Sequence, residues 1–369
     1  MQEDFHYYCT GVLARAAGFN SEDALIIAYA SQYVDDATES ELIRLDVKES
    51  DLKFDPVRTC YRGLESVLSL SWSAQKRVWI PFHFLPPKRF NPRKPKTFSF
   101  LTDAGSEFAG DLLDEAESEP LANHKRRLCR IGVALHTYAD TWSHGGFSGR
   151  RNRDENDVGG IHVYDRSKRK WQHLWIENVI LDAPPQIGHA EAGYFPDLAY
   201  ARWKCAVGPS EREAQRDNTA EFRGAAETIY DRLCTMEKAN ATERIPWNEL
   251  RPAITKLLAQ GPVKPLKLTD RLTLSAYLAY HKADLEERCE KWKREFAHLF
   301  APSPERYSYD PETWRKDAIE GDTAWDDYTE RDWLEMLPWK LKRGFWDSLW
   351  VHFHRAALHQ RHFVLENLP

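Results

Sequence analysis

Several features that define whole classes of protein are missing from this sequence of 369 residues. It contains no run of about 18 apolar residues, so no transmembrane helix is expected. The first residues have neither the positive region nor the apolar stretch of a signal peptide, so the chain is predicted to begin near Met1 and to be cytoplasmic. The six cysteines form no CxxC pair, which favours buried free thiols. A net charge of −6 argues against a general nucleic-acid coat protein.

A convincing set of alternating strands is also missing, and helical periodicity is strong at both ends, so the predicted class is all-α. Apolar residues recur at helical spacing from Phe5 to Ala16, and Glu22 to about Val34 is apolar nearly all round. Residues 40–104 carry six prolines and are predicted to be irregular, as an ordered functional loop. Further helices are predicted at Ser106–Glu117, Leu121–His144, 173–182, 210–238, 247–259, 270–300, 323–336 and 341–365.

The sharpest chemical signal lies in residues 134–144, which read Ala-Leu-His-Thr-Tyr-Ala-Asp-Thr-Trp-Ser-His. His136, Asp140 and His144 are spaced at i, i+4 and i+8, so a helix places them on one face. Imidazoles and carboxylates are good zinc ligands. The alternative is a polar helix face that meets water, but the flanking Leu and Trp residues favour a metal site.

Other candidate ligands are scattered singly along the chain, and each alone is more often an ordinary core or surface residue. An acidic pair closes the second predicted helix, where carboxylates oppose the helix dipole unless a cation compensates them. A histidine inside an apolar run is expected to be buried and held by a partner. These candidates are His6, Asp35 or Asp36, His83, and His189 with Glu191 or Asp197.

The order of these residues resembles the superfamily of zinc-dependent phospholipase C and single-strand-specific nucleases, which includes a domain of GPI-specific phospholipase D. Its members are all-helical and hold a trinuclear zinc centre. The match covers roughly residues 1 to 200. The sequence looks closest to an uncharacterised bacterial branch, through its Asp-Phe-His-Tyr-Tyr start, its Ser-Gln-Tyr-Val-Asp-Asp stretch and its Ser-His-Gly-Gly-Phe-Ser-Gly segment.

The resemblance implies a multi-helix bundle of the phospholipase C type with additional C-terminal helices. Residues 1–209 would form the metal-binding catalytic core, and residues 210–369 would pack on it as a helical region or continue the same domain. The resemblance also implies a ligand set taken from along the core. The implied ligands are His6, Asp35 as the bridging aspartate (with Asp36 as its alternative), His83, His136, Asp140, His144, His189 and finally Asp197 or Glu191.

The sequence departs from the secreted members of the superfamily in three ways. Those enzymes use a processed N-terminal Trp whose amine binds zinc, whereas here His6 follows Met1 too closely for that arrangement to be assumed. The spacing from Asp140 to His144 is shorter, nearer to that of the GPI-specific phospholipase D type. The position four residues after His189, where the final acid is usual, is Gly193.

The resemblance implies a hydrolase that uses two or three zinc ions to cleave phosphoester bonds in phospholipids or single-stranded nucleic acid. Asp35 would bridge metals and accept a hydrogen bond from the attacking water. Two basic stretches can attract phosphate, although a charge run is more often a solvated loop. Their weak candidate substrate-binding residues are Lys88, Arg89, Arg169 and Lys170.

Two other classes of function fit the same residues. One is a non-catalytic helical protein with a structural or degenerate metal site, whose metal would be fully ligated. The other is a helical interaction scaffold with incidental histidines, which would fold normally without metal.

Overall fold

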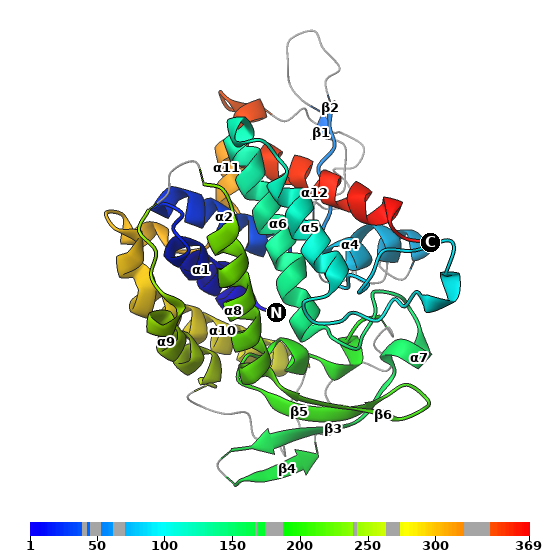
Figure 1. The fold of residues 1–369 in the computed structure, drawn as a ribbon. Coiled ribbons are helices and arrows are strands. Elements are labelled where there is room, and N and C mark those ends of the chain that lie inside the picture. The colour runs from blue at the N-terminus through cyan, green and yellow to red at the C-terminus, as the bar shows by residue number, and fades with distance from the viewer. Residues whose placement is uncertain are drawn as a thin grey trace.

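The computed structural model describes residues 1–38, 43–44, 53–61, 71–166, 168–173, 187–238, 242–262, 274–320 and 340–369. Most of these residues are helical (Figure 1). The α-helices are α1 (Thr10–Ala16), α2 (Ser21–Tyr33), α3 (Trp72–Ala74), α4 (Ile80–Phe82), α5 (Glu107–Glu117), α6 (His124–Ser143), α7 (Arg153–Asn156), α8 (Asn218–Thr235), α9 (Trp247–Ala259), α10 (Leu274–Phe296), α11 (Thr313–Ala318) and α12 (Leu349–Glu366).

Wider and narrower helical turns extend or connect these helices. The π-helical turns are η1 (Asp4–Cys9) and η3 (Gln75–Trp79). The 3-10 turns are η4 (Pro95–Thr97), η5 (Leu121–Asn123), η7 (Ala190–Ala192), η8 (Phe195–Asp197), η9 (Ala297–Phe300), η10 (Pro304–Arg306) and η13 (Phe345–Asp347).

The all-α prediction is wrong, because the described residues include a four-stranded antiparallel sheet beside the helices (Figure 1). Its strand order is β4-β3-β5-β6, so the protein is of mixed α/β structure. The strands of this sheet are β3 (Val158–Asp165), β4 (Lys170–His173), β5 (Arg202–Val207) and β6 (Arg212–Asp217). A separate two-stranded pair is formed by β1 (Ile43–Arg44) and β2 (Lys53–Phe54).

The alternating burial of side chains along β5 explains why a sheet forms here. In β5 the side chains of Trp203, Cys205 and Val207 are buried and the residues between them are not, which is the period of two of a half-buried strand. Strand β6 has no buried residue, so no hydrophobic pattern marks it. It becomes a strand because β5 pairs with it, with Arg202 opposite Asp217.

Several predicted helices are confirmed, and others need correction. Those at Ser106–Glu117, Leu121–His144 and 247–259 correspond to α5, α6 and α9. The helix predicted over 210–238 begins only at Asn218, because the preceding residues pair as β6. The predictions for 323–336 and for most of 173–182 lie outside the described residues.

The proline-rich segment 40–104 was predicted to be irregular, but its described part contains a helical stretch formed by α3, η3 and α4. Ser71 starts this stretch by accepting a hydrogen bond from the Ala74 N–H. Pro81 is the second residue of α4, close to the end of this stretch. This stretch leads directly to His83.

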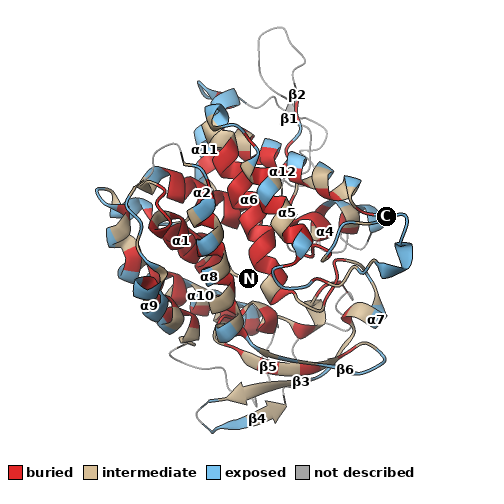
Figure 2. Ribbon diagram, in the orientation of Figure 1, coloured by how far each residue is buried: buried red, intermediate tan, exposed pale blue. Residues whose placement is uncertain are grey.

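Helix α6 is the centre of the molecule and packs against α2, α5, α8 and α12. It is buried along most of its length (Figure 2). One hydrophobic core runs from Met1 to Leu368, so the regions 1–209 and 210–369 share it. A second hydrophobic cluster lies against the sheet and includes Phe84, Phe147 and Trp203. Among the described helices, none is both long and apolar enough to cross a membrane.

Candidate metal centre

Helix α6 brings three ligand-type side chains into the protein interior at its C-terminal end. His136 and Asp140 lie within the helix, and His144 lies just after its last residue. All three are at most 5% exposed. Such a buried carboxylate between imidazoles requires partners, and side chains from other segments supply them in three groups. In each group, one ligand atom per residue lies within 4.8 Å of the others, so each group can hold a metal ion.

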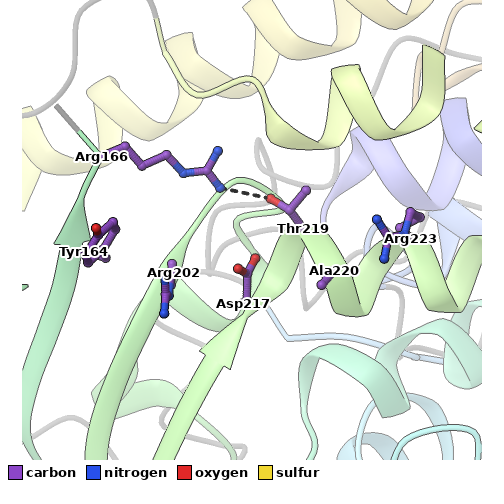
Figure 3. Close-up of a pocket in the computed structure, with 7 residues that line it drawn as sticks. All are labelled: Tyr164, Arg166, Arg202, Asp217, Thr219, Ala220 and Arg223. Atoms are coloured by element: carbon purple, nitrogen blue, oxygen red, sulfur yellow. Dashed lines mark hydrogen bonds between the residues drawn. The ribbon is translucent and has the colours of Figure 1, made fainter. Parts of the chain in front are cut away.

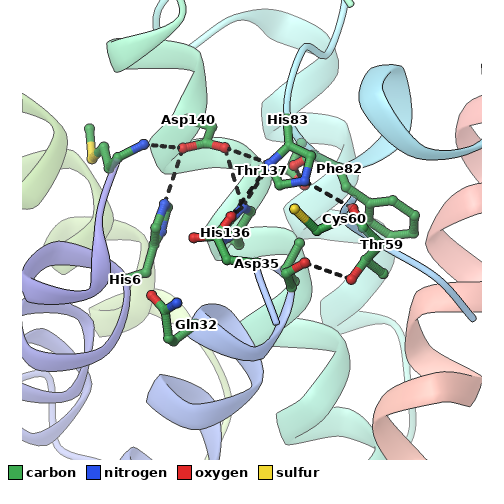
Figure 4. A network of polar contacts seen from close by, with 12 residues as sticks. His6, Gln32, Asp35, Thr59, Cys60, Phe82, His83, His136, Thr137 and Asp140 are labelled. Atoms are coloured by element: carbon green, nitrogen blue, oxygen red, sulfur yellow. Dashed lines mark hydrogen bonds and ion pairs between the residues drawn. The ribbon is translucent and has the colours of Figure 1, made fainter. Parts of the chain in front are cut away.

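The first group consists of His6, His136 and Asp140 (Figure 4). The Nε2 atom of His6, on η1, lies 3.1 Å from Oδ1 of Asp140. The Nε2 atom of His136 lies 3.2 Å from the other carboxylate oxygen, Oδ2. The two imidazole rings stack with centroids 3.9 Å apart. The N-terminal histidine and the central helix therefore meet at a single carboxylate.

The second group consists of Asp35, Cys60 and His83. His83 follows α4, and its Nδ1 atom lies 3.2 Å from Oδ2 of Asp140 and 3.8 Å from Oδ1 of Asp35. The Nε2 atom of His136 is also 3.7 Å from that Asp35 oxygen. The second group is thus continuous with the first, as Figure 4 shows.

The third group consists of His144, His189 and Asp197. The Nε2 atom of His144 lies 3.2 Å from Oδ1 of Asp197, and the Nε2 atom of His189 lies 3.3 Å from Oδ2. The ring of Phe84 stacks on His144 with a centroid separation of 4.5 Å. This group is connected to the first through Asp140, whose Oδ2 lies 3.6 Å from Nδ1 of His144.

Backbone carbonyl groups orient three of the histidines. The ring nitrogen of His83 that faces away from the carboxylates, Nε2, lies 2.9 Å from the Thr59 carbonyl oxygen. The Nδ1 atom of His144 lies 2.7 Å from the His83 carbonyl oxygen, and the Nδ1 atom of His189 lies 3.2 Å from the Gly193 carbonyl oxygen. When the ring N–H donates to the carbonyl, the other nitrogen is left free for a metal, as in typical metal sites.

The α-amino group of Met1 lies between two of the carboxylates. Its nitrogen is 2.6 Å from Oδ1 of Asp140 and 3.1 Å from Oδ1 of Asp197. It also donates to the Ser143 hydroxyl at 3.0 Å. Burial alone would lower the pKa of this amine, but the two carboxylates outweigh burial and raise it to about 11. The sequence reasoning did not place this amine at the site.

Four of these groups are held in the protonation state that binds metals. Burial alone would raise the pKa of Asp140, but His144 and the Met1 amine hold it well below its usual value. The pKa of Asp197 is also lowered, because the same amine and His189 outweigh burial. Burial lowers the pKa of His6 strongly and that of His189 to about 4. Ionised carboxylates and neutral imidazoles are the ligand forms.

The pKa of His83 is shifted in the opposite direction to those of His6 and His189. Burial alone would lower its pKa, but its hydrogen bonds with Asp140 and Cys60 and the charge of Asp35 raise it well above the usual value. The ring binds a proton because two carboxylates and the Cys60 side chain face it, and a bound cation would favour the opposite, neutral form. The proton and a metal ion would therefore compete for the same nitrogen.

The structure separates the alternatives that the sequence left open. Asp35 belongs to the second group, whereas Asp36 accepts hydrogen bonds from Gln32 and Tyr309 instead. Asp197 belongs to the third group, whereas the Glu191 carboxylate accepts a hydrogen bond from the Val158 N–H.

The four basic candidates belong to none of the three groups. Arg89 pairs with Asp111 at 2.7 Å, and Lys88 lines a small cavity beside that pair. Arg169 is exposed in the turn between β3 and β4, and Lys170 is the exposed first residue of β4. A substrate role for these residues stays a prediction.

Among the side chains of the three groups, Cys60 is the one that the sequence did not mark as a ligand. The cysteines carry no pair motif, so a free thiol was expected there. Cys60 lies in a segment without helix or strand, and it is the only residue of that segment in its group. No pattern of neighbouring residues could have marked it, because only the folded chain brings it to His83.

The chain belongs to a family of unknown function, DUF6765, whose model matches residues 1–368. No curated protein and no solved structure matches the chain. The family extends across nearly the whole chain, from the segment that carries His6 to the end of the C-terminal helix region. The resemblance to the phospholipase C superfamily therefore stays a prediction.

Proposed function

We propose that the protein binds two or three zinc ions at these groups and hydrolyses phosphoester bonds. The observation that carries the proposal is the spacing of the ligand atoms. Two ligands of one tetrahedral zinc lie about 3.3 Å apart, given bonds of about 2.0–2.1 Å. The nitrogen–oxygen separations in the three groups run from 3.1 to 3.8 Å.

The chemistry of the donor set also supports a metal at this position. A donor set of imidazole, carboxylate and thiol suits zinc better than magnesium or calcium, which prefer oxygen ligands. Because Asp140 contacts His6 and His136 of the first group and His83 of the second, it is the candidate bridge between ions.

Clustered zinc ions supply Lewis acidity toward phosphate oxygens and activate water at neutral pH. The remaining chemistry falls to the protein side chains. Asp35 is the most exposed carboxylate of the three groups, with 28% of its side chain accessible against 1% for Asp140 and 15% for Asp197. Asp35 is therefore the carboxylate that a substrate can approach. We infer that it accepts the proton of the attacking water.

A closed, non-catalytic metal site is the second candidate function. It is favoured by the burial of the first group, in which His6 and His136 are 0% exposed and Asp140 is 1% exposed. Structural zinc sites have every position filled by protein ligands. The two functions differ in one measurable property, because both bind metal and only the first cleaves phosphoesters.

Metal content tests the proposal directly. The purified protein, dialysed against zinc, is measured by elemental analysis beside the double variant His136→Ala/Asp140→Ala. Two or three zinc ions per chain, reduced to one or none in the variant, would support the proposal. A protein without zinc that is still folded would overturn it and leave a helical scaffold.

Activity distinguishes catalysis from a structural site. The zinc-loaded protein is assayed with an activated phosphodiester, with single-stranded DNA and with phosphatidylcholine. Asp35→Asn should lower kcat about 100-fold or more. Asp36→Asn is the matched control, because the neighbouring carboxylate contacts Gln32 and Tyr309 outside the groups. Zinc binding without cleavage of any of the three substrates would favour the structural site.

A further inference from the structure

A cavity of about 410 Å³ lies at one end of the strands, where β3 and β5 meet the start of α8 (Figure 3). Its lining residues come from β3 and the turn after it, from β5, from the end of β6 and from the first turns of α8. They are Tyr164, Arg166, Arg202, Asp217, Thr219, Ala220 and Arg223. None of them belongs to the three metal-binding groups. The volume is that of a small-molecule site.

Three arginines line this cavity, and two of them are held in place. Arg166 reaches across toward α8 and donates hydrogen bonds of 3.3 Å to the Tyr200 carbonyl and the Thr219 hydroxyl (Figure 3). The Arg202 guanidinium lies 4.7 Å from the Tyr164 ring centroid and 5.6 Å from that of Trp171. Contacts of this kind hold the planar group in one orientation without using its N–H donors.

The hydrogen-bonding capacity of the arginines is mostly unused. No described residue accepts a hydrogen bond from the side chain of Arg202 or of Arg223. The cavity has one acidic side chain, Asp217, against three guanidinium groups. Asp217 forms no ion pair with a described arginine. The cavity therefore carries an uncompensated charge of about +2, because arginine stays protonated in proteins.

The start of α8 adds to this field. Thr219 and Ala220 are in the first turn of this helix of 18 residues, where backbone N–H groups have no intrahelical acceptor. Asp217, the residue before the helix, makes no capping hydrogen bond with its side chain. Arg223 is one turn further along, four positions after Thr219, and so projects from the same side of α8. An anion in the cavity would meet both guanidinium groups and helix N–H groups.

We propose that this cavity binds the phosphate group of a small molecule through Arg166, Arg202 and Arg223. Phosphate fits because a dianion matches the excess charge, and because planar guanidinium groups bind tetrahedral oxyanions through paired hydrogen bonds. The ligand is either free phosphate or a small phosphate ester. This site is independent of the proposed function, since it shares no residue with the metal centre.

Titration with inorganic phosphate, at constant ionic strength set by chloride, tests the proposal by calorimetry. Wild type should bind one phosphate saturably in the millimolar range or tighter. The double variant Arg202→Gln/Arg223→Gln should bind at least about tenfold more weakly, because charge-assisted hydrogen bonds are lost. If it fails to fold, Arg223→Gln alone serves, since no described residue depends on that side chain.

Two control variants make the result specific. Lys340→Gln/Arg343→Gln removes the same charge from exposed positions outside the cavity, and it should change the affinity less than about threefold. His136→Ala/Asp140→Ala should leave the phosphate affinity intact whether or not the protein binds zinc. Phosphate binding that survives the cavity variant and disappears in the metal-centre variant would overturn the proposal, as would no saturable binding.

A second ligand identifies the source of the phosphate. Tighter binding of glycerol 3-phosphate than of inorganic phosphate, lost in Arg202→Gln/Arg223→Gln, would identify a phosphate ester as the ligand. Equal or weaker binding of the ester would identify free phosphate.

Discussion

A Cβ atom added to Gly132 would lie 2.5 Å from the carbonyl oxygen of Ile27 and 2.6 Å from the Cβ of Ala30. Helices α6 and α2 are therefore in backbone contact at this point, one turn before His136. Only glycine allows this approach, because any side chain would force the helices apart. The contact sets the distance between α6, which carries His136 and Asp140, and α2, which leads to Asp35.

We predict that Gly132→Ala destabilises the protein by about 1–3 kcal/mol, because the added methyl group overpacks the helix contact. The matched control is Gly110→Ala in α5, where an added Cβ meets no atom within 4 Å. That change should stabilise the protein by about 0.5–1 kcal/mol, through the better helix propensity of alanine. Urea unfolding measures both. Equal stabilities of the two variants would contradict the proposed helix contact.

A second pair of glycines tests the support behind the third metal-binding group. Gly188 has a φ of +57° and Gly160 a φ of +61°, so alanine is strained to a similar degree at both. A Cβ at Gly188 would also lie 2.1 Å from the ring of Phe84, whereas at Gly160 it meets nothing within 4 Å. Phe84 packs on His144, so Gly188→Ala must displace this support.

We expect Gly188→Ala to weaken zinc binding about tenfold or more, in the range typical of residues that support metal ligands. Gly160→Ala should keep the wild-type zinc affinity and lose about 1–2 kcal/mol of stability from backbone strain alone. Competition with a zinc chelator measures the affinity, and thermal unfolding measures the stability. If both variants bind zinc equally well, Phe84 does not position the third group.

The N-terminal segment is tied to α10 by a buried ion pair. Arg288 donates hydrogen bonds to the Asp4 carboxylate, to Asp284 and to the Gln2 side chain. Arg288→Met should cost about 3–5 kcal/mol of stability, because it leaves two buried carboxylates without their cation. It should also weaken metal binding, since Asp4 lies two residues before His6.

The surface pair of Arg153 and Asp157 provides the control for that prediction. Arg153→Met should change the stability by less than about 1 kcal/mol, because an exposed ion pair is screened by water and salt. Chemical denaturation measures the stability of both variants. A similar small loss for Arg288→Met would mean that α10 does not hold the N-terminal segment.

The burial of His354, a residue outside the metal centre, predicts that stability depends on pH. Its Nδ1 atom accepts a hydrogen bond of 3.0 Å from the Val57 N–H, and burial lowers its pKa to about 3. The unfolded chain would protonate this histidine near pH 6.5. Stability is therefore fully present above that pH and is lost as the pH falls from about 6.5 toward 3, because the unfolded state binds the extra proton.

His354→Asn keeps an acceptor for Val57 and removes the titration. The slope of unfolding free energy between pH 6 and pH 4 should then be smaller than in wild type by up to about 1.4 kcal/mol per pH unit. His362→Asn, on the exposed side of the same helix, should leave the slope unchanged. An unchanged slope in His354→Asn would show that His354 is not buried in its neutral form.

The helices that carry the site were predictable because their patterns are local. The spacing of His136, Asp140 and His144 follows from helical periodicity, and α6 is where that spacing placed it. The sheet was not predictable in the same way. Strand β6 is polar and mostly exposed, and its structure depends on β5, which alone has the pattern of a half-buried strand. A strand without a pattern of its own is specified by its partner.

Which of two neighbouring carboxylates joins the metal-binding groups is likewise decided by the tertiary structure. From the sequence, Asp35 and Asp36 are equivalent carboxylates at the end of one helix. Their different surroundings arise from side chains distant in the chain. Tyr309 donates a hydrogen bond to Asp36, whereas His83 and His136 face Asp35. Cys60 joined the second group for the same reason.

The sequence by itself determined the residue types available for a metal centre and the helical face that presents the central three. The tertiary structure decided which remaining side chains join them, because these arrive singly from η1, from the end of α2, from the segment around Cys60 and His83, and from the segment around His189. Helical periodicity acts over a few residues. Ligand sets are assembled by packing between segments far apart in the chain, such as the contact of α6 with α2 at Gly132, and no local pattern encodes that distance.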